Sequence, residues 1–260
     1  MENNSSTAKL SIIMKRTFDI VISSIGLIFS IPILLPTMFL VWVQDRCSPF
    51  YIASRVGKNG VLFHMVKLRS MVINADKSGV DSTSSSDIRI TFVGHLLRRY
   101  KLDELTQLWN VLKGDMSLVG PRPNVKRETD LYTLEERKLL IVRPGITDFA
   151  SIVFYDEGEV LKDTKDPDIA YNQLIRPGKS KLGLFYIEHR SLFLDIRLCL
   201  ITILAVFSRR SALRQTEKII RKLEGNEELV ELASRRTPLV PMPPPGSTKI
   251  VTVRDGYPLA

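Results

Sequence analysis

The sequence predicts an α+β protein, in which a mostly helical domain with a small β element is joined to an apolar N-terminal membrane segment. Three observations favour this class. An uncharged apolar stretch covers residues 20–43, a β-prone run with an Asn-Gly turn follows it, and later apolar positions recur mainly at helical spacing. We expect an anchoring segment over residues 1–46, a main domain over residues 47–210, and a charged, proline-rich tail over residues 211–260.

The uncharged stretch is long enough to enter or cross a bilayer. As one helix rising ~1.5 Å per residue it would reach about 36 Å. No small-residue cleavage site follows it, which argues against a removed signal peptide. Pro32 and Pro36 lie in its middle, where each removes a backbone donor, so we expect a sharp kink or break there. A kinked span and a re-entrant hairpin both remain open.

Composition narrows the partners without identifying them. The 260-residue chain is 44% hydrophobic and carries a formal net charge of +9, which favours anionic partners such as phosphates, nucleic acid or the cytoplasmic membrane leaflet. Cys47 and Cys199 lie far apart and in no metal-ligand spacing. A reducing, cytosolic environment therefore fits best.

Short strands are expected first, around residues 50–52 and 61–63, with Asn59-Gly60 as the hairpin turn. Apolar residues at helical spacing then predict an amphipathic helix over residues 102–112, with Asp103 and Glu104 in its first turn. Acidic residues in a first turn also interact favourably with the helix dipole. The spacing alone therefore does not decide whether Asp103 and Glu104 stabilise the helix or take part in catalysis.

Two arginines follow in proline-bounded turns. Arg122 lies in Gly120-Pro121-Arg122-Pro123, and Arg143 begins Arg143-Pro144-Gly145. Guanidinium groups held in this way are good phosphate ligands because they offer paired donors. The apolar stretch at residues 198–207 is too short to span a bilayer and predicts an interfacial or a core helix. A helix over residues 215–232 precedes the proline-rich end.

The motifs in chain order resemble those of the bacterial sugar transferase family of monotopic phosphoglycosyl transferases, over residues 15–207. They are Lys15-Arg16-Thr17-Phe18-Asp19, the proline-interrupted apolar segment, Arg55-Val56-Gly57-Lys58-Asn59-Gly60, Lys67-Leu68-Arg69-Ser70-Met71, Leu102-Asp103-Glu104-Leu105, Gly114-Asp115-Met116-Ser117-Leu118-Val119-Gly120-Pro121-Arg122-Pro123 and Arg143-Pro144-Gly145-Ile146-Thr147. The run from 102 to 123 is highly specific, since it joins a carboxylate dyad, a helix and a rigid arginine turn. No P-loop, GxGxxG, HExxH or GxSxG pattern supports another enzyme class.

The resemblance implies a re-entrant membrane helix broken at Pro32, interfacial amphipathic helices, and a cytosol-facing catalytic domain over residues 47–210. It implies that Asp103 and Glu104 are the catalytic dyad and that they hold Mg²⁺. The five basic residues Lys67, Arg69, Arg98, Arg122 and Arg143 are expected to contact phosphate or substrate.

The implied reaction transfers a sugar 1-phosphate from a nucleotide sugar, by analogy a uridine diphosphate sugar, to polyprenyl (undecaprenyl) phosphate. Asp103 would attack the sugar-bearing phosphate and form a covalent intermediate. The implied location is the cytoplasmic face of the bacterial inner membrane, among bilayer lipids, in the first membrane step of surface polysaccharide, such as lipopolysaccharide, or glycoconjugate assembly.

Some positions depart from the family pattern. Thr106 stands where the family often has Pro, Lys101 where Ser is frequent, and Ile31 where Ser is usual. The stretch at 148–155 lacks an expected Gly-x-Ala-Gln-Val run and a basic residue, and residues 156–181 form an insertion relative to the shortest members. The contacts to nucleotide and sugar in this region are therefore open.

Competing interpretations remain at this point. A non-catalytic scaffold for polysaccharide assembly would keep the fold without binding donor, although the intact dyad argues against it. A membrane-tethered nucleic-acid-binding protein is disfavoured, because the basic residues are dispersed and no binding motif accompanies them, so no nucleic acid is expected. Direct transfer, with Asp103 only holding metal, cannot be separated from covalent transfer by sequence. The formation of homo-oligomers is also open.

Overall fold

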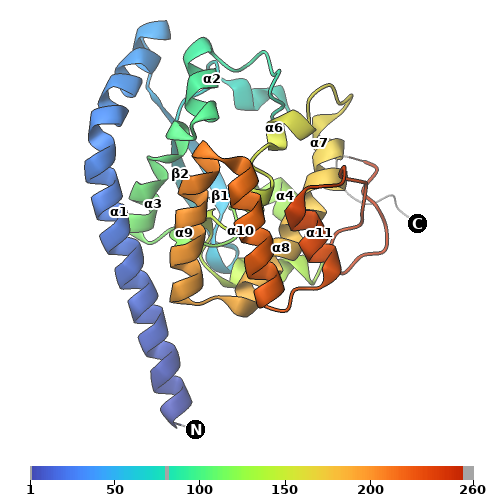
Figure 1. The fold of residues 1–260 in the computed structure, drawn as a ribbon. Coiled ribbons are helices and arrows are strands. Elements are labelled where there is room, and N and C mark those ends of the chain that lie inside the picture. Colours follow the sequence, from blue (N-terminus) through green and yellow to red (C-terminus); the bar gives the residue numbers. More distant parts are fainter. Residues whose placement is uncertain (1, 80–81, 254–260) are drawn as a thin grey trace.

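A long helix, α1 (Glu2–Asp45), lies along one side of a mostly helical domain (Figure 1). The structure is a computed structural model and describes residues 2–79 and 82–253. The further α-helices are α2 (Phe92–Arg99), α3 (Gln107–Lys113), α4 (Lys126–Asp130), α5 (Phe149–Val153), α6 (Glu157–Val160), α7 (Pro167–Ala170), α8 (Arg176–His189), α9 (Leu192–Phe207), α10 (Arg209–Lys222) and α11 (Glu227–Ser234). The strands are β1 (Phe50–Val56), β2 (Leu62–Leu68), β3 (Ser117–Val119) and β4 (Gly145–Thr147), and the shorter helical turns are η1 (Lys58–Gly60), η2 (Ala75–Ser78), η3 (Leu102–Glu104), η4 (Glu136–Ile141) and η5 (Tyr171–Ile175). The predicted α+β class is confirmed.

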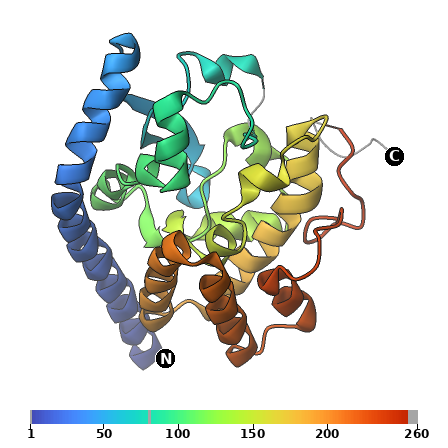
Figure 2. The same ribbon diagram turned by 45° about the horizontal axis from the view of Figure 1, so that its top comes forward.

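Helix α1 continues through Pro32 and Pro36, where the sequence predicts a sharp kink or break. Figure 2 shows that the helix bends near its middle. The Thr37 hydroxyl donates to two carbonyl oxygens of the preceding turn, at 2.8 and 2.9 Å. Such side-chain donors let a proline-containing apolar helix remain helical. By length and apolarity α1 is the one described helix that could cross a membrane.

Polar side chains fasten α1 to the domain on both sides of its apolar part. Near its start, the Arg16 guanidinium donates to two carbonyl oxygens at the end of α3, at 2.6 and 2.8 Å. At its end, Asp45 accepts two hydrogen bonds from Arg69, just beyond β2. Between these points Leu34 and Val41 are buried in a small apolar cluster with β2 and α2. The helix is therefore docked from Arg16 to Asp45.

Two small sheets support the loops around the dyad. The predicted hairpin is confirmed: β1 pairs antiparallel with β2, and Asn59 and Gly60 adopt the left-handed conformation that its turn requires. Sequence reasoning missed the second sheet, in which β3 pairs in parallel with β4. A Cβ atom on Gly145 would lie 2.1 Å from the Gly120 nitrogen, so only glycine allows the two backbones to approach this closely.

The main core is built around α5, which packs against α8, α9 and α10. Asp148 caps this helix by accepting a hydrogen bond from the Ser151 backbone N–H at 2.7 Å. Phe149, Ile152 and Val153 behind it are almost completely buried. The stretch that departs from the family pattern is thus a core helix in this chain.

The C-terminal region beyond residue 210 packs onto the same core. Helices α10 and α11 both contribute buried residues to it, and Gly225 lies between them where the sequence predicts one continuous helix. The proline-rich segment returns across η4 and η5, where the Gln173 side chain donates to the Val251 carbonyl oxygen at 2.7 Å. Up to residue 253 this region is therefore integrated with the domain.

One face of α9 joins the core through Leu194, Leu198 and Ile201, while the opposite face stays open and apolar. The outward side chains include Leu200, exposed to 62%, and Phe207, exposed to 83%. An exposed apolar face of this kind is typical of helices that meet another apolar phase. The core helix is thus confirmed for one face, and the interfacial placement of the other face stays a prediction.

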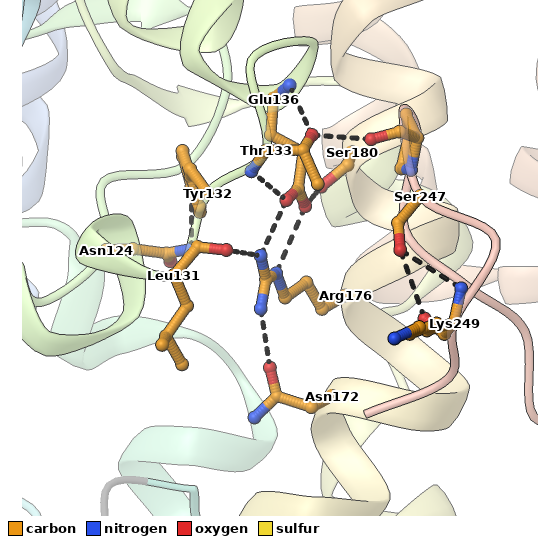
Figure 3. A network of polar contacts seen from close by, with 11 residues as sticks. Asn124, Leu131, Tyr132, Thr133, Glu136, Asn172, Arg176, Ser180, Ser247 and Lys249 are labelled. Carbon is orange, nitrogen blue, oxygen red and sulfur yellow. Dashed lines mark hydrogen bonds and ion pairs between the residues drawn. The ribbon is translucent and has the colours of Figure 1, made fainter. Parts of the chain in front are cut away.

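A buried ion pair joins α8 to the turn η4 (Figure 3). The Arg176 guanidinium donates to both carboxylate oxygens of Glu136, to the Asn172 side chain and to the Leu131 carbonyl oxygen. Ser180 donates a further hydrogen bond to Glu136 at 2.7 Å. Because the charged groups are satisfied, removing one partner leaves the other buried and uncompensated.

We predict that Arg176→Met lowers the free energy of unfolding by about 3–5 kcal/mol. The double variant Arg176→Met/Glu136→Leu should lose less, because no charge stays buried alone. Chemical unfolding in detergent, followed by circular dichroism, measures both. Lys138→Ala is the control, since its pair with Glu135 is exposed and should contribute less than about 1 kcal/mol. Equal losses for Arg176→Met and Lys138→Ala would contradict the prediction.

Candidate active site

Asp103 and Glu104 lie in the 3₁₀ turn η3, directly before α3. The sequence predicts one helix here, and the structure divides it into η3 and α3. Side chains of α3 hold this region against β2: the Thr106 hydroxyl donates to the Val66 carbonyl oxygen at 3.0 Å, and the Asn110 side chain accepts from the Val66 N–H at 2.9 Å. These bonds place the dyad beside Lys67, the next residue of β2.

The two carboxylates of the dyad have opposite environments. Asp103 is buried, and its Oδ1 atom has no hydrogen-bond partner. Burial, together with the charge of Glu104, raises the pKa of Asp103 against the opposing charges of Lys67, Lys101 and Arg98. An unpartnered carboxylate oxygen inside a protein is costly, and a ligand or an ion that completes the site is one explanation for it.

Glu104 is fully engaged by cations. Arg122 donates to both of its carboxylate oxygens, and the Lys67 ammonium lies 3.8 Å from Oε1. Burial favours the neutral acid, but Arg122 and Lys67 together hold the pKa of Glu104 well below its usual range. Glu104 is therefore ionised and fixes the positions of both cations.

Three of the five predicted basic residues surround the dyad. Arg122 and Lys67 contact Glu104, and the Arg98 guanidinium donates to the Ser70 hydroxyl at 3.0 Å while its charge acts on Asp103. Burial and the neighbouring Arg122 lower the pKa of Lys67 to about 8. The site thus concentrates positive charge, as binding of a diphosphate requires.

The other two predicted arginines make contacts elsewhere. Arg69 donates to Asp45 and to the Ser48 carbonyl oxygen, so it ties the end of α1 to the hairpin. Arg143 donates to the Gly114 carbonyl oxygen at 2.8 Å, at the end of α3. A basic residue at the end of a helix stabilises its free carbonyl groups. The structure thus gives both arginines an anchoring role.

The proline-bounded turns are locked together behind the dyad. The Gly120 N–H donates to the Thr147 carbonyl oxygen at 3.0 Å, and the Gly145 N–H donates to the Pro121 carbonyl oxygen at the same distance. These bonds extend the β3 and β4 pairing into the turn that carries Arg122. The Arg143-Pro144-Gly145 motif thereby helps to position the turn that carries Arg122.

Sequence reasoning missed three residues near the dyad. Lys101 precedes η3, Tyr155 follows α5, and Glu157 begins α6 within the insertion. Their proximity follows from their charges and contacts, since Lys101 acts on both dyad carboxylates and Glu157 acts on Arg122. Lys101 is close to the dyad in the chain, but no motif gave it a role. Only the tertiary fold brings α5 and α6 to η3, so no local pattern could have identified Tyr155 and Glu157.

A small pocket lies behind Arg122, lined by Asp148, Ser151, Tyr171 and Lys179 among others. It opens between the arginine turn, α5 and α8, next to the insertion. The Lys179 ammonium is paired with Glu157, so the insertion contributes charge to this wall. The pocket mixes anionic and cationic groups, as recognition of a polar ligand requires.

The donor set around Asp103 is compatible with Mg²⁺. This ion takes oxygen ligands, keeps several waters and is commonly held by one or two carboxylates together with substrate phosphates. The unpartnered Asp103 Oδ1 is the available carboxylate oxygen, whereas both oxygens of Glu104 contact cations. Within the described residues no cluster of three or more His, Cys, Asp or Glu side chains forms a complete protein cage.

The fold and this site define a class: an α+β domain with a long apolar N-terminal helix and a buried carboxylate dyad among basic side chains. A family model described as bacterial sugar transferase matches residues 10–209. The chain therefore belongs to the bacterial sugar transferase family.

Several curated relatives share this part of the chain. UDP-N-acetylgalactosamine-undecaprenyl-phosphate N-acetylgalactosaminephosphotransferase of Aeromonas hydrophila is 33% identical, over 75% of this chain and 44% of the relative. Undecaprenyl-phosphate galactose phosphotransferase of Salmonella typhimurium is 37% identical, over 64% and 40%. The exopolysaccharide production protein ExoY of Rhizobium meliloti is 32% identical, over 76% and 87%. The chain thus spans less than half the length of the first two relatives.

The unequal environments of the dyad predict opposite effects of neutral substitutions on stability. Asp103→Asn should raise the thermal midpoint by about 2–4 °C, because it removes a buried, unpartnered charge worth roughly 1 kcal/mol. Glu104→Gln should cost roughly 2 kcal/mol, because it leaves Arg122 and Lys67 without their carboxylate.

Differential scanning fluorimetry of the detergent-solubilised protein, without added metal or nucleotide, tests this pair of variants. The single variant Asp130→Asn, at the exposed ion pair with Lys126, is the control and should change the midpoint little. Destabilisation by Asp103→Asn to the same degree as by Glu104→Gln would show that Asp103 is an ordinary structural carboxylate.

Proposed function

We propose that the chain is a phosphoglycosyl transferase that moves a sugar 1-phosphate from a nucleoside diphosphate sugar to polyprenyl phosphate. The observation that carries the proposal is the buried, unpartnered oxygen of Asp103 beside a carboxylate that holds two cations. The names of the Aeromonas and Salmonella relatives, which act on undecaprenyl phosphate, support the acceptor class.

In the first half of the reaction, an oxygen of the Asp103 carboxylate attacks the sugar-bearing phosphorus of the donor. A bond forms between this oxygen and phosphorus, and the bond from phosphorus to the bridging oxygen breaks. The electron pair leaves with the nucleoside monophosphate. The phosphosugar remains on Asp103 as an acyl phosphate, which divides one displacement into two easier ones.

In the second half, a phosphate oxygen of polyprenyl phosphate attacks the same phosphorus. The bond between phosphorus and Asp103 breaks, which regenerates the carboxylate and leaves a lipid-linked diphosphosugar. Both steps need an ionised Asp103 as nucleophile or leaving group. Lys67, Lys101 and Arg98 favour this ionised form against the effect of burial.

The cations neutralise the charge of the phosphates as it shifts during transfer. Glu104 holds Arg122 and Lys67 in place, so these donors are oriented before substrate binds. When bound, Mg²⁺ would supply further neutralisation of phosphate charge, and the Asp103 carboxylate, with Glu104 as a second candidate, would hold it. Arg98 is the remaining candidate for a phosphate contact.

We propose a uridine diphosphate sugar as donor, because the names of two relatives specify UDP-N-acetylgalactosamine and UDP-galactose. The product would serve assembly of a surface polysaccharide such as exopolysaccharide or lipopolysaccharide, in line with the exopolysaccharide proteins among the relatives. The sugar itself would be selected by the pocket wall at 148–181, where this chain differs from the family pattern.

We further propose that α1 is re-entrant, so that both of its polar flanks lie on the cytoplasmic side of the inner membrane. Arg16 and Asp45 flank the apolar part, and each is bonded to the same charged domain. A perpendicular span would draw that domain into the bilayer, where its charged groups would be costly. The open apolar faces of α1 and α9 would then contact bilayer lipids.

Turnover provides the test of the reaction. We expect the solubilised protein, with magnesium and polyprenyl phosphate, to release nucleoside monophosphate from at least one uridine diphosphate sugar. Asp103→Asn should reduce this release by at least about 10³-fold, because it removes the nucleophile. Asp130→Asn, at an exposed ion pair, is the matched control and should retain native turnover.

No release from any donor in a panel of nucleotide sugars would instead favour a non-catalytic scaffold. If release occurs but mass spectrometry of the enzyme trapped during turnover finds no phosphosugar on Asp103, direct transfer replaces the covalent route. Salt-sensitive binding of nucleic acid in the absence of turnover would favour a membrane-tethered nucleic-acid-binding protein.

Cysteine labelling tests the topology. The N-terminal flank of α1 is probed by Ser11→Cys in a protein that also carries Cys47→Ser and Cys199→Ser. The other flank is probed by native Cys47 in a protein that carries Cys199→Ser alone. A re-entrant helix predicts that a membrane-impermeant maleimide labels both in inside-out vesicles and neither in intact spheroplasts. Labelling of Ser11→Cys from outside and of Cys47 from inside would show a spanning helix.

A further inference from the structure

We propose that Lys101, held by Tyr155, is a donor-binding residue that contacts the diphosphate of the nucleotide sugar. This inference rests on the proposed function and extends it to a residue at which the chain departs from the family pattern. The observations that carry it are the position of Lys101 before the dyad, its contact with Tyr155, and its lack of a carboxylate partner.

The backbone places Lys101 at the entrance of η3. Its φ angle is 55°, in the left-handed region that glycine and asparagine adopt more readily than lysine. The turn that this conformation produces directs the chain into Asp103 and Glu104. A lysine at a position that favours glycine suggests that its side chain has a use.

Tyr155 holds the ammonium group of this side chain. The Lys101 nitrogen lies 4.9 Å from the centre of the Tyr155 ring, and the Tyr155 hydroxyl donates to the Arg99 carbonyl oxygen at 3.1 Å. The ring therefore supports the ammonium while the hydroxyl ties the end of α5 to the segment before the dyad. Tyr155 itself lies close to both dyad carboxylates, whose charges help burial to raise its pKa.

Lys101 differs from the other cations of the site in having no ion pair. Lys67 and Arg122 are paired with Glu104, whereas no carboxylate of the described residues lies within 4.0 Å of the Lys101 nitrogen. Its charge nevertheless acts on both Asp103 and Glu104. An aromatic face holds an ammonium more weakly than a phosphate oxygen does. Lys101 can therefore leave the ring and contact an incoming diphosphate without breaking an ion pair.

The contact between Lys101 and Tyr155 also compensates for a basic residue that the family pattern has after Thr147 and that this chain lacks. The positions around 155 carry no cation here, and Tyr155 instead receives one from the segment before the dyad. The positive charge at this wall of the site thus comes from Lys101. Because the group is not neutralised, it adds to the attraction for an anionic donor and not to the stability of the empty site.

Two substitutions separate the charge of Lys101 from its backbone role. Lys101→Asn removes the charge but retains a residue that tolerates positive φ, and Lys101→Arg keeps the charge. We expect Lys101→Asn to raise the KM for the uridine diphosphate sugar about tenfold and to weaken the binding of uridine diphosphate with magnesium by a similar factor. The KM for polyprenyl phosphate should stay within about twofold, and Lys101→Arg should restore both donor values to within about threefold.

Two further variants are needed: Tyr155→Phe tests the hydroxyl of Tyr155, and Lys126→Asn is a control for loss of a positive charge elsewhere. Tyr155→Phe keeps the ring and should affect donor binding less than Lys101→Asn, while Lys126→Asn, at an exposed ion pair, should leave the KM unchanged. Steady-state kinetics and titration calorimetry of the full chain provide the readouts. In calorimetry, the salt dependence of uridine diphosphate binding should be shallower for Lys101→Asn than for the native protein.

Native donor KM and native uridine diphosphate affinity in Lys101→Asn would overturn this inference while leaving the transferase intact. Equal losses in Lys101→Asn and Lys101→Arg, affecting donor and acceptor alike, would also overturn it and assign the residue a structural role. A native protein that neither binds uridine diphosphate nor releases nucleotide would remove the proposed function and this inference together.

Discussion

The contact between Glu104 and Arg122 is the interaction on which the site depends, because it joins segments that are distant in the chain. Glu104 belongs to the turn before α3, and Arg122 belongs to a turn fixed between two prolines. Lys67, from the hairpin, contacts the same carboxylate. A single ionised side chain thus organises donors from two other segments. Burying the charge of Glu104 is tolerated because Arg122 donates to both of its carboxylate oxygens. Without such partners a buried charge would be strongly unfavourable.

Two adjacent carboxylates therefore carry different tasks because their surroundings differ. Glu104 is saturated with cations and stays ionised, whereas Asp103 keeps an oxygen without a partner. Environments that separate the pKa values of neighbouring acids are a recurring way to divide roles in an active site. The 3₁₀ turn contributes to this division, since consecutive side chains in it point in different directions, and only that of Glu104 is hydrogen-bonded to Arg122.

Much of the fold and part of the site could be predicted from the sequence, and the reasons for the failures are specific. The hairpin followed from Asn59-Gly60, because that turn chemistry is local. Strands β3 and β4 are three residues each and pair in parallel across a long separation, so neither leaves a recognisable pattern. The resemblance to the family predicted that Lys67, Arg98 and Arg122 act at the dyad, and the structure places them around it. Spacing could not show that Arg69 and Arg143 are bonded to Asp45 and Gly114, since those partners are set by tertiary packing.

Tertiary contacts also explain how the chain tolerates its departures from the family pattern. Thr106 replaces a frequent proline with a side chain that bonds to β2, and the stretch at 148–155 exchanges a glycine-rich run for the buried helix α5. Each change has a structural partner elsewhere: α5 is covered by α8 and α10, and the regions beyond residue 210 supply part of that cover.

The docking of α1 then sets how the dyad meets the membrane. Helix α3 follows the dyad directly and packs against α1, where a Cβ atom on Gly26 would lie 3.1 Å from the Leu108 side chain. Close approach of the two helices thus depends on a glycine within the apolar part of α1. In the proposed reaction the acceptor phosphate, at the end of a lipid chain, would lie at the membrane surface. The contact between α1 and α3 would then hold Asp103 at that depth, so that the apolar helix would contribute to the active-site geometry as well as to anchoring.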